Sequence, residues 1–72
     1  MLQQQLGRQI GKLRRRQGFT QEQLAEVLEC SVEFISLVER GVNAPSVAGL
    51  EKFAKALKVD VRELFTFDEK KR

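Results

Sequence analysis

Residues 18–41 read GFTQEQLAEVLECSVEFISLVERG, and this stretch decides the fold. Thr20 precedes an apolar helical pattern and has Gln23 three residues later, which is the capping-box signature of a helix start. Ser31 precedes a second helical pattern with Glu33 in its first turn, where a carboxylate interacts favourably with the helix dipole. The sequence therefore predicts two short helices joined by a turn of about three residues, with a glycine just outside each end of the pair.

Helical periodicity continues on both sides of this stretch, and no run of residues alternates as a strand would. A first helix is expected from about Gln3 to Gln17, ahead of the glycine. Ser46 is the expected N-cap of a fourth helix. Asp60 and Glu63 predict another capping box, which would open a short fifth helix. The predicted fold class is all-α, a compact five-helix domain.

Length and composition limit the class of protein. At 72 residues and 8.3 kDa the chain has room for one domain, placed at 1–72, with a core over about 6–66 and a charged tail at 67–72. The chain is 42% hydrophobic and 32% charged, as soluble globular proteins are. It contains no membrane-spanning run, opens with no signal-peptide pattern and has one cysteine, Cys30. We therefore expect a cytoplasmic protein with no membrane partner and with Cys30 as a small core residue, a redox sensor being the alternative.

The inventory of residue types argues against an enzyme. The chain has no histidine, which excludes Ser-His-Asp and Cys-His catalysis, and its single cysteine excludes a tetrahedral zinc site. It also lacks a glycine-rich phosphate loop, and a chain of this size offers little volume for a substrate cleft. We expect a binding function with no cofactor, no metal and no small-molecule ligand.

The net charge of +3 is distributed unevenly. The first eighteen residues carry five arginines and lysines and no acid, whereas residues 19–45 carry five glutamates against Arg40. Any attraction to a polyanion must therefore come mostly from the first helix, Arg40 and the tail.

When a short turn joins two helices, the second helix can project outward from the domain. Particular residues indicate which family of proteins uses this arrangement here. The informative segments are 18–25 (GFTQEQLA), 35–41 (ISLVERG), 43–46 (NAPS), 57–60 (LKVD) and Leu64-Phe65. Together they resemble the lambda-repressor-like (Cro and XRE-type) helix-turn-helix family, over residues 6–66. The resemblance implies a sequence-specific regulator of transcription that binds double-stranded DNA and places its helix 31–40 in the major groove.

The resemblance also implies roles for individual residues. The residues expected to face the bases are Val32, Glu33, Ser36 and Leu37. Those expected at DNA phosphates are Gln21, Arg40 and Asn43. Gln21 is also expected to brace the recognition helix. Arg14 and Glu39 match a pair that the family joins in a buried salt bridge, which would give Glu39 the partner that a buried carboxylate requires.

The sequence departs from the family pattern at several positions. Glu29 stands where the family usually has a glycine in the turn, and Val42 stands where a Lys or Arg often contacts phosphate. The expected base-facing residues include no Arg, Lys, Asn or Gln, the usual readers of guanine and adenine. Phe34, beside them, could pack on the core, stack on a sugar or belong to a protein-binding patch. The alternative function is therefore a protein-interaction module that retains the fold without reading DNA.

The end of the chain is rich in apolar residues and suggests a homodimer, which would double the number of phosphate contacts. The expected interface residues are Val61, Leu64, Phe65 and Phe67. The simpler alternative is that Leu64 and Phe65 close the core of a single chain.

Overall fold

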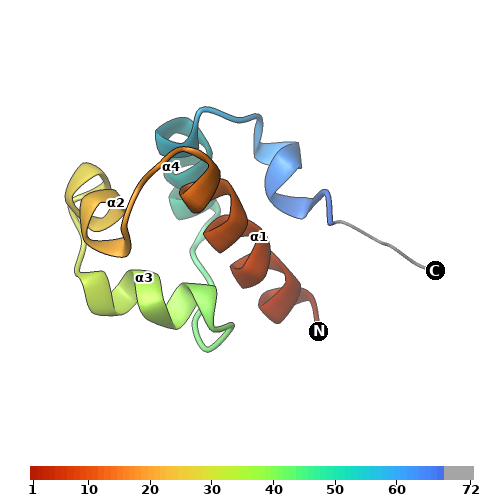
Figure 1. Ribbon diagram of the computed structural model, residues 1–72. Coiled ribbons are helices and arrows are strands. Elements are labelled where there is room, and N and C mark those ends of the chain that lie inside the picture. The colour runs from red at the N-terminus through yellow and green to blue at the C-terminus, as the bar shows by residue number, and fades with distance from the viewer. Residues whose placement is uncertain (68–72) are drawn as a thin grey trace.

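The computed structural model describes residues 1–67 of the chain. That part contains four α-helices, one 3-10 helix and no strand: α1 (Leu2–Arg16), α2 (Gln21–Leu28), α3 (Val32–Glu39), α4 (Val47–Leu57) and η1 (Val61–Phe65). In Figure 1, α2 and α3 lie on one side of α1 and η1 lies on the other. The all-α class is as predicted, and residues 68–72 of the expected tail lie outside the described residues.

Side chains at the predicted caps define the starts of α2, α3 and α4. The Thr20 hydroxyl accepts from the Gln23 N–H at 3.0 Å, and the Gln23 side chain accepts from the Thr20 N–H at 2.9 Å, which completes the capping box. Ser31 and Ser46 each accept from the N–H three residues later, at 3.0 Å. These bonds satisfy donors that have no partner inside a helix.

The prediction of a fifth α-helix is wrong, because the last element is a 3-10 helix of five residues. The Asp60 carboxylate accepts from the Arg62 N–H at 3.0 Å, so it does not form the expected capping box with Glu63. This backbone bond and the Arg62 charge lower the pKa of Asp60. Glu63 instead links η1 to α1, since its carbonyl accepts from Gln9 Nε2 at 2.8 Å.

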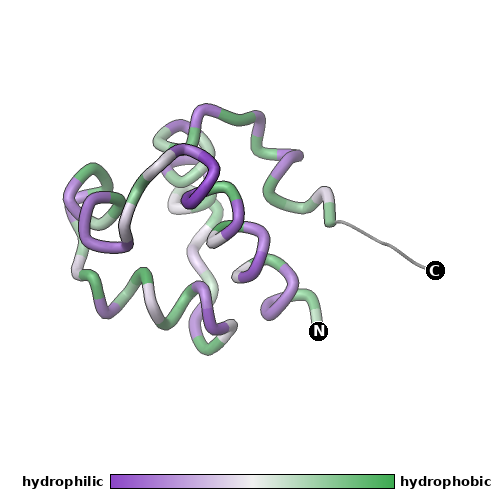
Figure 2. Tube along the Cα trace, viewed as in Figure 1, coloured by the Kyte–Doolittle hydropathy of each residue, from purple (hydrophilic) through white to green (hydrophobic). Residues whose placement is uncertain are grey.

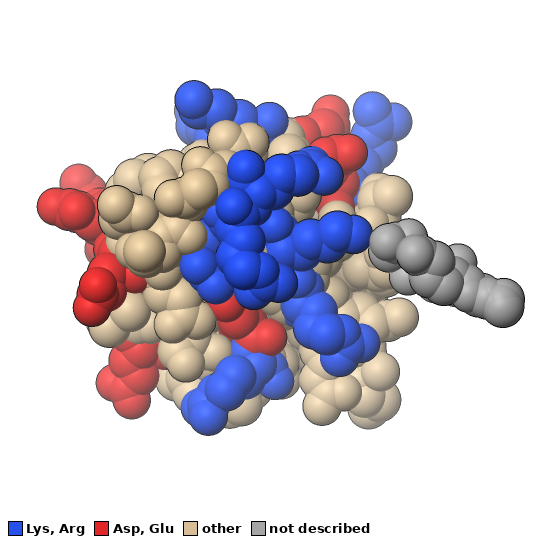
Figure 3. All heavy atoms as spheres, in the orientation of Figure 1, with Lys and Arg blue, Asp and Glu red and all other residues tan. Residues whose placement is uncertain are grey.

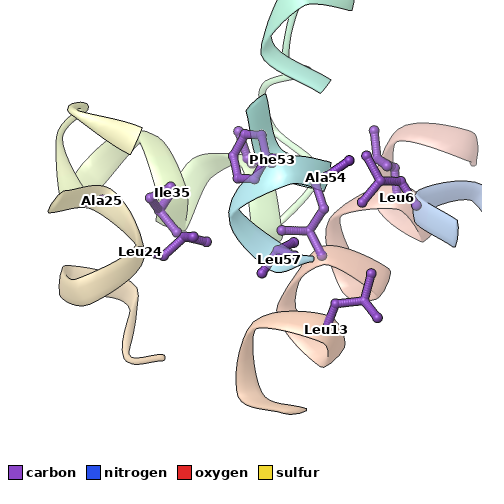
Figure 4. Packing of buried hydrophobic residues seen from close by; sticks show 11 residues of the cluster. Leu6, Leu13, Leu24, Ala25, Ile35, Phe53, Ala54 and Leu57 are labelled. Atoms are coloured by element: carbon purple, nitrogen blue, oxygen red, sulfur yellow. The ribbon is translucent and has the colours of Figure 1, made fainter. Parts of the chain in front are cut away.

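The core lies between all five elements. Figure 2 shows apolar and polar residues interspersed within each helix, which gives each one an apolar side to bury. Leu24 of α2 and Ile35 of α3 lie next to each other, and Phe53 and Leu57 of α4 lie between them and the α1 residues Leu6 and Leu13 (Figure 4). The buried hydrophobic residues are Leu6, Ile10, Leu13, Leu24, Ala25, Ile35, Val38, Phe53, Ala54, Leu57 and Leu64. Within residues 1–67 no helix has the length and apolar character needed to cross a membrane.

Glu29 ends α2 in the left-handed conformation, with φ 57° and ψ 45°. A side chain in this region strains the backbone, and glycine relieves that strain but loses more conformational entropy on folding. We expect Glu29→Gly to raise the free energy of unfolding by about 0.5–1 kcal/mol, measured by thermal or urea denaturation.

The matched control for this prediction is Glu26→Gly, on the same exposed side of α2 but inside the helix. It should lower the free energy of unfolding by about 1 kcal/mol, as glycine does in a helix interior. A lower melting temperature for Glu29→Gly would contradict the predicted relief of strain.

Candidate nucleic-acid interface

The turn between α2 and α3 is short and internally bonded. Glu29 supplies the left-handed residue, and the Cys30 N–H donates to the Ala25 carbonyl at 3.0 Å. Ser31 then caps α3. Leu24 and Ala25 of α2 are buried in the same core cluster as Ile35 of α3, so packing and the turn together fix the position of one helix relative to the other. Figure 1 shows the result, with the outer side of α3 facing away from the rest of the described chain.

A polar cluster behind α3 ties three helices together. Arg14 Nε of α1 donates to Glu39 Oε2 at 2.6 Å, and Arg14 Nη2 donates to Glu39 Oε1 at 3.3 Å. Both side chains are only 11% exposed, so this is the internal ion pair that the family resemblance implied. Arg14 Nη1 also donates to the Phe19 carbonyl at 2.8 Å, and Gln21 Nε2 donates to Glu39 Oε1 at 3.0 Å. We refer to Arg14, Gln21 and Glu39 as the polar hub.

The hub shows how Gln21 braces α3, the role that the family resemblance implied, because Glu39 is the residue that it holds. The Gln21 amide braces Glu39 from the start of α2, and the side chain is half-buried. The amide nitrogen carries two hydrogens, so one remains for another acceptor. A Gln side chain hydrogen-bonds a carboxylate in many settings, and only the three-helix geometry shows that this one reaches Glu39.

The expected base-facing residues differ in exposure. Val32 is 42% exposed and Glu33 is exposed, at the start of α3. Ser36 and Leu37 are half-buried. None of the four is sealed beneath the same chain, so an outside partner can reach the outer side of α3. Phe34 packs partly against the core, which matches the first of its three alternatives.

The loop after α3 is held by backbone bonds. The N–H groups of Val42 and Asn43 donate to the Leu37 carbonyl, at 2.9 and 3.3 Å. Gly41 has φ +79° and lies against Gln4 of α1, so a side chain at position 41 would clash as well as strain the backbone. Arg40 and Asn43 are exposed on this loop, beside the end of α3.

Charge is separated across the surface. Figure 3 shows Lys and Arg gathered over α1, with Asp and Glu along the edge formed by α2 and α3. The helix that would enter a groove is therefore acidic at its start. Arg40 is the exposed cation nearest in sequence to its end.

Cys30 lies on the other side of the turn, next to a pocket lined by Leu28, Phe34, Lys52 and Phe53. It is partly buried and packs against the core, as expected for a small core residue. Burial raises the pKa of its thiol, which disfavours the reactive thiolate. Among the described residues no group of three or more His, Cys, Asp or Glu could hold a metal ion.

The expected dimer residues divide into two groups. Leu64 is fully buried between α1 and α4, so its assignment to an interface is wrong. Val61 is 37% exposed and Phe65 is 38% exposed. The Phe67 ring is half-buried and packs edge-on against that of Phe65, with centroids 6.4 Å apart.

Comparisons with known proteins agree with this geometry. The competence pilus inhibition repressor of Acinetobacter baylyi is 42% identical over 64 residues, which are 89% of this chain and 58% of that protein. The chain thus spans little more than half of this relative. The restriction-modification controller protein C.AhdI of Aeromonas hydrophila matches with a TM-score of 0.82 at 34% identity, over 86% of this chain and 94% of that one.

The regulator of biofilm formation SinR, solved in complex with DNA, matches with a TM-score of 0.76 at 32% identity, over 82% of this chain and 95% of that one. The family model described as "Helix-turn-helix domain" matches residues 5–65, most of the chain. This protein belongs to the helix-turn-helix domain family.

Proposed function

We propose that the protein is a sequence-specific regulator of transcription that binds double-stranded DNA and inserts α3 in the major groove. The observation that carries this proposal is the open outer side of α3, held outward by the polar hub and the bonded turn. A major groove about 12 Å wide admits one α-helix, and the residues on its exposed side then meet base edges. SinR, which shares this fold, was solved with DNA, which supports the same partner here.

Within this proposal the residues take distinct roles. Val32 and Leu37 contact thymine methyl groups, Glu33 accepts from a cytosine amino group, and Ser36 bonds to either kind of partner. The phosphate contacts come from Gln21, Arg40 and Asn43, which lie at the start of α2 and on the loop after α3. A reading side without Arg or Lys makes the phosphate contacts the main source of affinity.

A titration of duplex DNA tests this function. A duplex chosen by selection from random sequences should bind with an affinity that falls as salt rises, with a logarithmic slope of about −0.9 per neutralised phosphate and several units in total. Arg40→Ala should weaken binding to all sequences and reduce the slope by about one phosphate. Lys55→Ala is the matched control. Lys55 is also an exposed cation, but it lies on α4 next to the C-terminal end of α2, and not at the end of α3 where Arg40 lies.

The alternative function is a protein-interaction module, and the apolar and acidic character of the outer side of α3 favours it. Val32 is exposed there beside Glu33, and no cation accompanies them. Absence of salt-dependent binding to duplex DNA at low salt would support this alternative and refute the regulator. Loss of partner binding in Leu37→Ala with unchanged DNA affinity would also favour the interaction module.

We further propose that two copies pair through an apolar surface formed by Val61 and Phe65 of η1 and by Phe67, which follows it. Burial of these three apolar side chains against a second copy removes apolar surface from water, an interaction that persists at high salt. Phe65→Ser should reduce the dimer fraction seen by sedimentation at high salt. Val47→Ser, which replaces a valine that is 78% exposed at the start of α4, should leave it unchanged. Equal dimer loss in both variants would exclude η1 as the interface.

A further inference from the structure

One side of α1 carries a row of cations. Arg8, Lys12 and Arg15 are all exposed, and their spacing of four and three residues places them on one face of the helix. Within residues 1–67 neither Arg8 nor Arg15 belongs to an ion pair. The row extends about 10 Å along the helix, seven residues at 1.5 Å each. We name these three residues the basic row.

α2 carries a row of acids with the same spacing. Glu22, Glu26 and Glu29 are exposed and again four and three residues apart, with Glu29 at the C-cap. Within the described residues none of the three forms an ion pair. We name them the acidic row. The two rows match in number and length and are opposite in charge, and in antiparallel order their middle residues are offset by one position, about 1.5 Å along the helix.

The two rows of one molecule cannot meet each other. Figure 3 shows the cations over α1 in the middle of the view and the acids at the edge of the molecule, over α2 and α3. We propose that the basic row of one copy docks on the acidic row of a second copy. The two helices run antiparallel, so that Arg15 faces Glu22, Lys12 faces Glu26 and Arg8 faces Glu29.

The helix dipoles select the antiparallel arrangement. It brings the negative C-terminal end of α1 beside the positive N-terminal end of α2, and parallel helices would place like ends together. Such a contact is heterologous, because different surfaces meet, and it adds copies in a row. It is therefore separate from a symmetric pairing through η1, and it requires no DNA.

A second copy fits these rows better than a nucleic acid does. DNA could neutralise the basic row but would repel the acidic one, whereas a second copy uses both. Exposed ion pairs are individually weak, so the association is weak in dilute solution and sensitive to salt. This association should weaken as salt rises, whereas the apolar contact at η1 should not, so the salt dependence distinguishes the two contacts.

The test is sedimentation of the whole chain over a range of concentrations, with two matched double variants. For the wild type, the weight-average mass should rise with concentration at low salt. This rise should vanish near 1 M salt, where the Debye length is about 3 Å. R15E/E22K exchanges the charges of one proposed pair, so every contact stays attractive and the association should remain. R15E/E29K has the same composition and net charge but makes two of the three contacts repulsive, and should associate roughly tenfold more weakly.

Circular dichroism must first show that both double variants fold. Lysine is acceptable at position 29, since Lys58 already occupies a left-handed C-cap in this chain. Retained association in R15E/E29K with loss in R15E/E22K would overturn the antiparallel arrangement. Equal association of the two variants, or a wild type without salt-sensitive association, would overturn the interface itself, whatever the affinity for DNA.

Discussion

Arg14→Ala is expected to lower the free energy of unfolding by about 3–5 kcal/mol, the cost of leaving one member of a buried ion pair alone. Glu39 is 11% exposed and would lose the donors at 2.6 and 3.3 Å, leaving the neutral Gln21 amide as its hub partner. The Phe19 carbonyl would lose its guanidinium donor as well. Urea denaturation, followed by circular dichroism, measures the change.

Arg15→Ala is the matched control, because Arg15 is the next residue of α1 but is exposed and forms no ion pair within residues 1–67. Its effect on the free energy of unfolding should stay within about 0.5 kcal/mol, as for most surface substitutions. The double variant Arg14→Ala/Glu39→Ala should be less destabilised than the sum of the single variants, since it removes both charges together. Equal melting temperatures for Arg14→Ala and Arg15→Ala would refute the structural importance of the ion pair.

Gly7→Ala is expected to destabilise the protein although alanine normally favours a helix by about 1 kcal/mol over glycine. A Cβ at position 7 would lie 2.3 Å from the Val38 carbonyl oxygen and 2.6 Å from that of Glu39. Both are backbone atoms of α3, so α1 and α3 would have to separate. The free energy of unfolding should fall by about 1–3 kcal/mol, the usual range for overpacking.

Gly49→Ala serves as the control for helix propensity. It lies in the first turn of α4, and its Cβ would meet only the side chains of Pro45 and Ser46, at 3.2 and 3.3 Å. These atoms can yield by a few tenths of an ångström, so Gly49→Ala should be clearly more stable than Gly7→Ala. A Gly7→Ala variant with wild-type stability would show that α1 and α3 do not pack as closely as described.

Helix starts were predictable because they depend on local chemistry. Thr20, Ser31 and Ser46 each satisfy an N–H group three residues ahead, an arrangement that the sequence itself displays. The same reasoning failed at Asp60, because Arg62 donates to that carboxylate instead. Five residues form too short an element for a capping pattern to determine its helix type.

The site was predicted in part, because its geometry depends on contacts between distant segments. The Arg14–Glu39 pair followed from a family resemblance, and the approach of Gln21 to the same carboxylate required the positions of three helices. Leu64 could not be distinguished from Phe65 by pattern alone. Both are apolar, and only packing against α1 and α4 shows that Leu64 is buried and Phe65 is exposed.

In α3 the residues that anchor the helix and the residues that face outward are different, and this has a consequence for redesign. Ile35 and Val38 anchor the helix in the core, and Glu39 anchors it through the hub. Val32 and Glu33 lie on the opposite, open side. If α3 binds DNA as proposed, substituting those two positions should change which sequences are bound with little effect on folding.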